Sequence, residues 1–195
     1  MVMKRDGRNL RNIDAAALAG VCFVLIEAFY YQLVLGELPC AFCNLIRVGF
    51  MLFGGGLLLN MRFGVSVWNY VLSASGALIG GLISLLFMFA KAPPYTTPTG
   101  SAIFGLHMYT WSYIAFTVAL MYCVVMLALH APVAAGNEQS AVGSPSIPRS
   151  IVIGVFVLLV GANLLSAFLQ NGFHTFKAGG QKHYQMLYDG DVMKP

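Results

Sequence analysis

Long apolar runs, separated by short segments that hold most of the charged residues, form the main pattern along this chain. A helix needs about 20 residues to cross ~30 Å of hydrocarbon, and five runs come near this length. They cover residues 13–35, 45–62, 67–90, 106–130 and 150–170. Because a backbone in lipid must satisfy its N–H and C=O groups within its own segment, each run is expected to be helical. The pattern predicts an all-α integral membrane protein.

Composition supports the same class of protein. Hydrophobic residues make up 58% of the 195 positions and charged residues only 9%, whereas charged residues make up roughly a quarter of a soluble domain. We expect a single membrane domain over residues 1–195, embedded in a lipid bilayer. The net charge of +4 comes from residues at the ends and in loops, so it indicates membrane topology and no nucleic-acid partner.

The distribution of basic residues predicts the orientation. Four of them precede the first run, namely Lys4, Arg5, Arg8 and Arg11. By the positive-inside rule, the N-terminus is expected on the cytoplasmic side of a bacterial inner membrane. The loop after the first run, the Pro-rich loop 91–105 and the tail 171–195 then face the periplasm, which is oxidising. The linker 131–149 is rich in Ala, Ser, Gly and Pro, and is expected on the inner face.

Glycines are concentrated in the second and third runs, at Gly54, Gly55, Gly56, Gly76 and Gly80. Small residues allow helices in a membrane to approach one another closely. We therefore expect these glycines to serve helix packing and not a cofactor.

Redox-capable residues lie between the first two runs, where Pro39 precedes Cys40 and Cys43 follows. Two thiols at this spacing near a helix start can close a disulfide. The unpaired N–H groups and the dipole at the start of a helix favour a thiolate. Arg47 lies one turn further along the same helical face. Its charge also favours the thiolate, and its guanidinium can donate hydrogen bonds to a carbonyl of an electron acceptor.

Other interpretations of these residues stay open. Cys40 and Cys43 can form a purely structural disulfide, or half of a metal site whose other ligands are not evident. Arg47 can extend along the helix to the bilayer surface without binding anything.

The order of these parts resembles the DsbB (disulfide bond formation protein B) family of bacterial inner-membrane thiol:quinone oxidoreductases. The resemblance implies a four-helix transmembrane bundle over about residues 13–130. It also implies that Cys40 and Cys43 form the disulfide nearest a quinone, with Cys43 facing the ring and Arg47 in the quinone site. Electrons would pass from a reduced DsbA-like periplasmic partner to ubiquinone or menaquinone.

The chain also departs from this family. Typical members carry a second cysteine pair between the third and fourth spans, and residues 91–105 contain none. The fifth span is an addition to the four-helix pattern. Cys22 and Cys123 lie within spans, and we expect them to be inert packing residues. Two alternatives follow: a specialised thiol relay for one partner, or a membrane scaffold in which the Cys40–Cys43 disulfide is structural.

Two polar residues at the outer ends of spans are further candidates for the quinone site. Glu27 lies where an ionised carboxylate is costly, so we expect it to pair with Arg47, to relay quinone protons, or to be a neutral structural acid. His107 opens the fourth run, and its imidazole can hydrogen-bond a quinone oxygen, accept a proton, or serve only the membrane interface. The same choice between site and interface applies to Tyr30, Tyr31, Gln32, Tyr109 and Trp111.

Overall fold

Five helices dominate the computed structural model, which describes residues 3–91, 102–134, 147–172, 184 and 186. The helices are α1 (Met3–Leu33), α2 (Ala41–Phe63), α3 (Val67–Ala90), α4 (Met108–Ala134) and α5 (Ile147–Asn171), with a small hairpin of β1 (Ala102–Ile103) and β2 (Leu106–His107). Within these described ranges, five helices are long and apolar enough to cross a membrane. The predicted all-α membrane architecture is confirmed.

The outer ends of the helices differ from the predicted spans for local reasons. α1 ends at Leu33 and the chain turns at Gly36, whose φ of 67° is in the left-handed region that glycine adopts easily. α2 begins at Ala41, four residues before the predicted span, because Cys40 caps it. The Cys40 sulfur accepts a hydrogen bond from the backbone N–H of Cys43 at 3.4 Å. The dithiol is therefore part of the first turn of α2.

The predicted connecting segments are shorter than expected or lie outside the described ranges. α4 extends to Ala134 and α5 starts at Ile147, so helix occupies both ends of the predicted linker 131–149. Most of the predicted outward loop 91–105 and of the tail 171–195 lies outside the described residues. The end of that loop forms the β1–β2 hairpin directly before α4.

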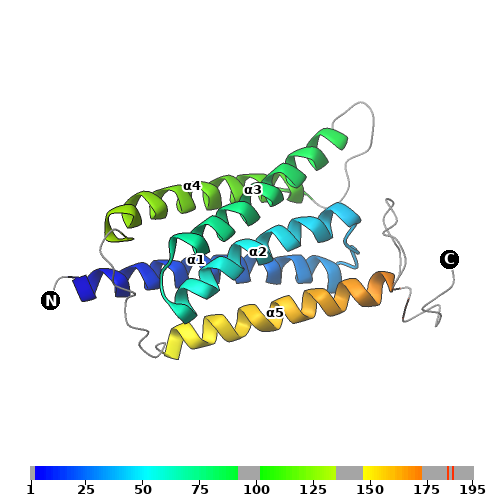
Figure 1. Cartoon of the computed structure of the whole chain (residues 1–195). Helices are drawn as coiled ribbons and strands as arrows, with labels where there is room; N and C mark the ends of the chain where they lie inside the picture. The colour runs from blue at the N-terminus through cyan, green and yellow to red at the C-terminus, as the bar shows by residue number, and fades with distance from the viewer. Residues whose placement is uncertain (1–2, 92–101, 135–146, 173–183, 185, 187–195) are drawn as a thin grey trace.

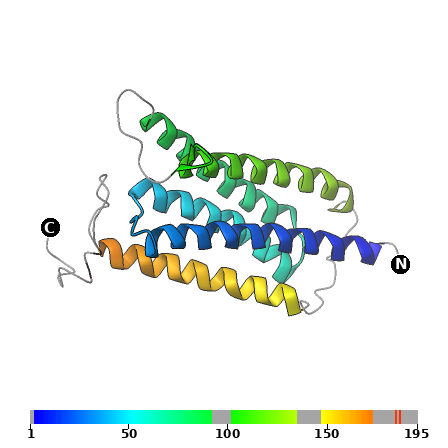
Figure 2. The same cartoon turned by 180° about the vertical axis from the view of Figure 1, so that it is seen from behind.

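α2 lies at the centre of the arrangement (Figures 1 and 2). It packs against α1 and α3, while α4 packs mainly against α3, and α5 lies along α1 and also contacts α2. The end of α1, the start of α2 and the end of α5 meet at one end of the molecule. The dithiol turn therefore lies beside the last turns of α5.

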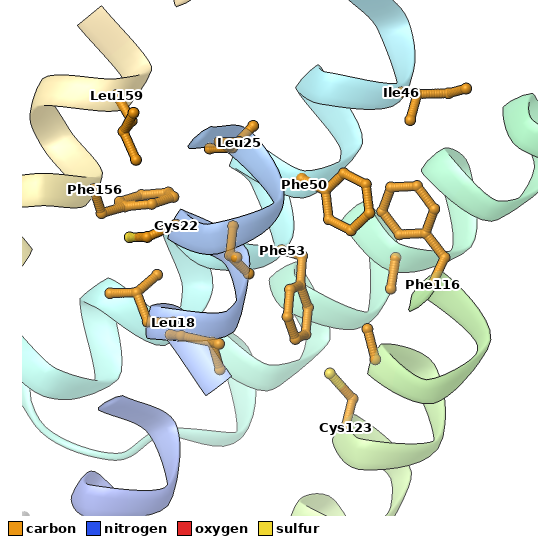
Figure 3. Close-up of a cluster of buried hydrophobic side chains, with 14 of the residues drawn as sticks. Leu18, Cys22, Leu25, Ile46, Phe50, Phe53, Phe116, Cys123, Phe156 and Leu159 are labelled. Carbon is orange, nitrogen blue, oxygen red and sulfur yellow. The ribbon is translucent and has the colours of Figure 1, made fainter. Parts of the chain in front are cut away.

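Buried apolar side chains fill the space around α2. Phe50 of α2 stacks on Phe116 of α4, with ring centroids 4.0 Å apart. Phe156 of α5 points from the opposite side toward Cys22 and Leu18 of α1, as Figure 3 shows. The core thus includes α5 as well as the first four helices.

Glycine provides the room for these contacts. A Cβ added at Gly54 would lie 2.5 Å from Cε2 of Phe156, so only glycine fits beneath this ring. The packing role is confirmed in the same way at three other predicted positions, Gly56, Gly76 and Gly80. At Gly55 the prediction is wrong: an added Cβ would meet no atom within 4 Å, because this position faces away from the neighbouring helices.

A buried carboxylate joins three helices near the other end of the molecule. Asp14 of α1 is fully buried and accepts hydrogen bonds from the hydroxyls of Tyr70 on α3, at 3.0 Å, and Tyr122 on α4, at 2.6 Å. Close by in sequence, Asn12 accepts from Arg149 of α5 at 2.8 Å. Polar contacts thus connect α1 to three other helices at this end.

Candidate dithiol site

The two thiols lie within contact distance at the head of α2. Cys40 Sγ and Cys43 Sγ are 2.8 Å apart, and both are free thiols. The hydrogen bond from Cys43 lowers the pKa of the Cys40 thiol to about 6, against the opposing effect of burial. A pKa near 6 favours the thiolate of Cys40 at neutral pH, and the thiolate is the reactive form of cysteine.

Arg47 lies one turn below the dithiol and is only 8% exposed. Its guanidinium donates hydrogen bonds to Oε1 of Gln32 at 2.7 Å, to the carbonyl of Ala28 at 2.9 Å and to Oδ1 of Asn163 at 3.3 Å. It also lies over the ring of Phe29, 5.5 Å from its centroid. These contacts hold the side chain between α1 and α5, so the alternative that it extends to the bilayer surface does not apply.

Glu27 is half-buried on α1 and is not one of these partners. The expected ion pair between Glu27 and Arg47 is not formed in the described part of the chain, where uncharged oxygen atoms surround the guanidinium. Amide and carbonyl oxygens can satisfy a buried guanidinium without the desolvation of a second charge.

Three polar residues of α5 complete this side of the site. Asn163 contacts Arg47 directly. Ser166 accepts a hydrogen bond from Nε2 of Gln32 at 2.6 Å, and Gln170 donates from Nε2 to the carbonyl of Pro39 at 2.6 Å. Sequence reasoning missed all three, although their spacing of three and four residues in an apolar span indicates one polar helical face.

Gln32 is the junction of this network. Its Oε1 accepts from Arg47, and its Nε2 donates both to Ser166 and to the hydroxyl of Tyr184 in the tail. It is 3% exposed. Among residues 30–32, for which the sequence leaves site and interface roles open, Gln32 is the one that contacts Arg47.

His107 lies on the other flank of α2. Its Nδ1 is buried without a hydrogen-bond partner among the described residues. A row of rings connects it to the dithiol turn: His107 to Tyr109 at 5.3 Å, Tyr109 to Phe87 at 5.0 Å, and Phe87 to Phe42 at 5.2 Å between centroids. Phe42 stands between the two cysteines in sequence, so this row of rings ends at the dithiol turn.

The other two cysteines are away from this site. Cys22 and Cys123 are 5% and 0% exposed and lie in the apolar core (Figure 3). This placement agrees with the predicted packing role. It leaves Cys40 and Cys43 as the two thiols at the helix start.

Comparison with known proteins points to one family. A search among curated proteins and a search among solved structures found no match. The family model described as "Disulfide bond formation protein DsbB" matches residues 11–99. This region includes α1 from Arg11 onward, the dithiol turn, α2 and α3, and so contains Cys40, Cys43 and Arg47. Over residues 11–99 the chain is therefore similar to the DsbB family of disulfide bond formation proteins.

Proposed function

We propose that this multi-pass membrane protein is a thiol:quinone oxidoreductase. It would reoxidise a reduced DsbA-like periplasmic partner of the thioredoxin fold and pass the electrons from Cys40 and Cys43 to ubiquinone or menaquinone. One observation carries the proposal: two sulfurs 2.8 Å apart lie at the start of α2, a helix long and apolar enough to cross a membrane, with the buried guanidinium of Arg47 one turn below them.

The two cysteines have different roles in this reaction. A partner thiolate attacks the sulfur of Cys40, and the bond between Cys40 and Cys43 breaks. A mixed disulfide forms between the partner and Cys40, while the sulfur of Cys43 is released as a thiolate. The second partner thiolate then resolves the mixed disulfide and leaves both cysteines reduced. Reoxidation of the pair releases two electrons and two protons. The lowered pKa of Cys40 provides a thiolate for exchange with the partner. Cys43 lies one turn nearer the membrane interior, on the side where a quinone would bind.

The residues around Arg47 fit a quinone carbonyl. A guanidinium has five N–H donors, and three of them donate to described residues of this chain. The remaining donors suit a carbonyl oxygen, in a site that is buried and partly aromatic through Phe29. When bound, a quinone would supply the two-electron oxidant.

The candidates His107 and Glu27 have weaker support. Nδ1 of His107 is buried with no hydrogen-bond partner in the part of the chain that the structure describes, but its ring lies on the α3–α4 flank, whereas Arg47 faces α1 and α5. We therefore propose Arg47 as the main quinone contact, with His107 as a proton acceptor on the second flank. Glu27 is proposed only as a nearby proton carrier, because Arg47 has other partners.

The proposed location is a bacterial inner membrane, with the N-terminus in the cytoplasm and the dithiol loop and tail in the periplasm. The length of α1 separates the basic N-terminal residues from the dithiol, and α5 ends on the dithiol side. A periplasmic dithiol would meet partners in an oxidising compartment.

The test is oxidation of a reduced DsbA-like protein by the purified full chain, with and without added quinone. Oxidation of more than one partner molecule per chain is expected only with quinone, and Cys43→Ala should abolish it. Cys22→Ala is the matched control, because this cysteine lies in the core. Repeated turnover without quinone, or full activity of Cys43→Ala, would sink the proposal.

The route of electrons into the dithiol has its own test. The chain contains two cysteines besides this pair, and both are buried in spans, which favours direct exchange between the partner and Cys40. In Cys43→Ala the thiolate of Cys40 should attack the disulfide of the oxidised partner, break it, and so trap the partner as a mixed disulfide through Cys40. Failure to trap it would indicate that another protein transfers the electrons.

A further inference from the structure

The fifth helix lies beyond residues 11–99, which match the DsbB family, yet it contacts the site at several points. Buried or half-buried positions recur along α5 at helical spacing, and three of them on the dithiol side are the polar residues Asn163, Ser166 and Gln170. A polar face within an apolar span is costly in lipid unless its groups are paired. Each of these three side chains is paired with the region of α1 and α2 that holds the dithiol and Arg47.

Gln170 contacts both sides of the dithiol turn. Its Nε2 donates to the carbonyl of Pro39 at 2.6 Å, directly before Cys40. Its Oε1 accepts from Nδ2 of Asn44 at 3.3 Å, directly after Cys43. Gln170 is 2% exposed, so water does not compete effectively for these hydrogen bonds. One side chain thereby spans the four-residue segment whose geometry sets the distance between the sulfurs.

One to two helical turns further into the membrane, α5 holds the arginine. Asn163 accepts from Arg47, while Ser166 accepts from Gln32, which itself accepts from Arg47 at 2.7 Å. Arg47 is therefore held from α5 both directly and through Gln32.

The rest of α5 fixes its position along the bundle. Phe156 lies against Gly54 of α2 in the core, and Arg149 donates to Asn12 of α1 at the other end. The helix is thus held at its middle and near its start, so the register of its polar face relative to the dithiol is set.

We propose that α5 is a functional part of the dithiol site, with Gln170 as a positioning residue for the Cys40–Cys43 turn and Asn163 and Ser166 as positioning residues for Arg47. No electron passes through α5; its role is to hold the sulfurs in contact and the guanidinium beneath them. The inference rests on the proposed role of Cys40 and Cys43 as reacting thiols. Its test, however, needs neither a quinone nor a partner protein.

The test measures how the alkylation rate of Cys40 depends on pH in the reduced full chain in detergent micelles. The contact with Cys43 keeps Cys40 ionised down to about pH 6. Gln170→Leu removes both hydrogen bonds, so the turn should loosen and the midpoint should rise by on the order of one pH unit. Cys43 and Arg47, whose interactions with Cys40 affect its ionisation, are retained in every variant, and so is Glu37, three residues before Cys40 in sequence.

Leu165→Ala is the control, because Leu165 is on the exposed face of the same helix and should leave the midpoint unchanged. Asn44→Ala removes only the 3.3 Å hydrogen bond to Gln170 and should raise the midpoint by a smaller amount. This variant tests the proposal if Gln170→Leu does not fold. A folded Gln170→Leu or Asn44→Ala variant with the parent midpoint would overturn the proposal. An equal shift in Leu165→Ala would also overturn it. Loss of quinone activity alone, with the alkylation profiles as expected, would count against the proposed function and not against this inference.

Discussion

The packing of α5 onto α2 can be tested at two adjacent glycines. Gly54 and Gly55 are neighbours in sequence, but only Gly54 lies under Phe156, at a hypothetical Cβ distance of 2.5 Å, whereas Gly55 has no atom within 4 Å of such a Cβ. Gly54→Ala and Gly55→Ala make the same chemical change at the two positions. A difference in stability between them therefore measures the contact with α5.

The expected magnitude follows from two opposing effects. Replacing glycine by alanine within a helix stabilises it by about 1 kcal/mol, and this gain should appear in full at Gly55. At Gly54 the methyl group must displace the Phe156 ring, and overpacking of a core costs about 1–3 kcal/mol. Gly54→Ala should thus be less stable than Gly55→Ala by about 1–3 kcal/mol. Phe156→Ala should remove most of this difference, since it removes the ring that the methyl group meets.

The measurement is reversible unfolding of these variants in mixed micelles, followed by helical circular dichroism. The double variant Gly54→Ala, Phe156→Ala should be no less stable than Phe156→Ala alone. Equal stability of the two single glycine variants would refute the reasoning, as would a penalty at Gly54 that persists without the Phe156 ring.

Three other predictions concern the polar groups. The alkylation rate of Cys40 should fall as the pH decreases through about 6, because the thiolate becomes protonated there. An unchanged rate down to about pH 5 would show that the contact with Cys43 does not set the pKa of Cys40. Gln32→Leu should destabilise the protein by about 2 kcal/mol, because it removes the 2.7 Å hydrogen bond from Arg47. Asn163→Leu removes the longer 3.3 Å hydrogen bond and should destabilise the protein by about 1 kcal/mol. The reverse order of the two variants in unfolding experiments would contradict this assignment. Asp14→Leu should lower the free energy of unfolding by about 2 kcal/mol, because the hydroxyls of Tyr70 and Tyr122 lose their acceptor. An unchanged free energy of unfolding would show that the carboxylate does not hold the helices together.

Sequence information predicted the features that depend on nearby residues. The length of the apolar runs determines the spans, and the spacing of Cys40, Cys43 and Arg47 determines their order on one helix. The start of α2 was less predictable, since it depends on a cap made by the Cys40 sulfur.

Contacts between distant residues were not predictable in this way. Arg47 and Asn163 are 116 residues apart, and Pro39 and Gln170 are 131 apart. Their contact depends on which face α5 turns toward α1 and α2. The expected partner Glu27 was reasonable on charge alone, but helix geometry instead places Ala28 and Gln32 of α1 against Arg47.

The geometry of the dithiol turn also predicts its tendency to accept electrons. At pH 7 a thiol with a pKa near 6 is mostly ionised, whereas one with an ordinary pKa near 9 is mostly protonated. Ionisation stabilises the reduced form by at most about 1.4 kcal/mol, since solvent screens the partly exposed sulfur, and it raises the reduction potential of the pair by at most about 30 mV. The disulfide of this pair is thereby a better oxidant for a partner protein.

The reduction potential of the Cys40–Cys43 pair should therefore depend on the hydrogen bonds of Gln170. If Gln170→Leu raises the pKa of Cys40 by about one unit, the reduced form loses about 1 kcal/mol at pH 7 and the potential falls by about 20 mV. Equilibration with glutathione redox buffers measures this change, and Leu165→Ala should show no shift. At about pH 9 the thiolate is populated in both the parent and the Gln170 variant, and the pKa difference then contributes its full amount of about 30 mV. A difference in potential that does not grow between about pH 6 and about pH 9 would show that Gln170 acts on the disulfide by some means other than the Cys40 thiolate.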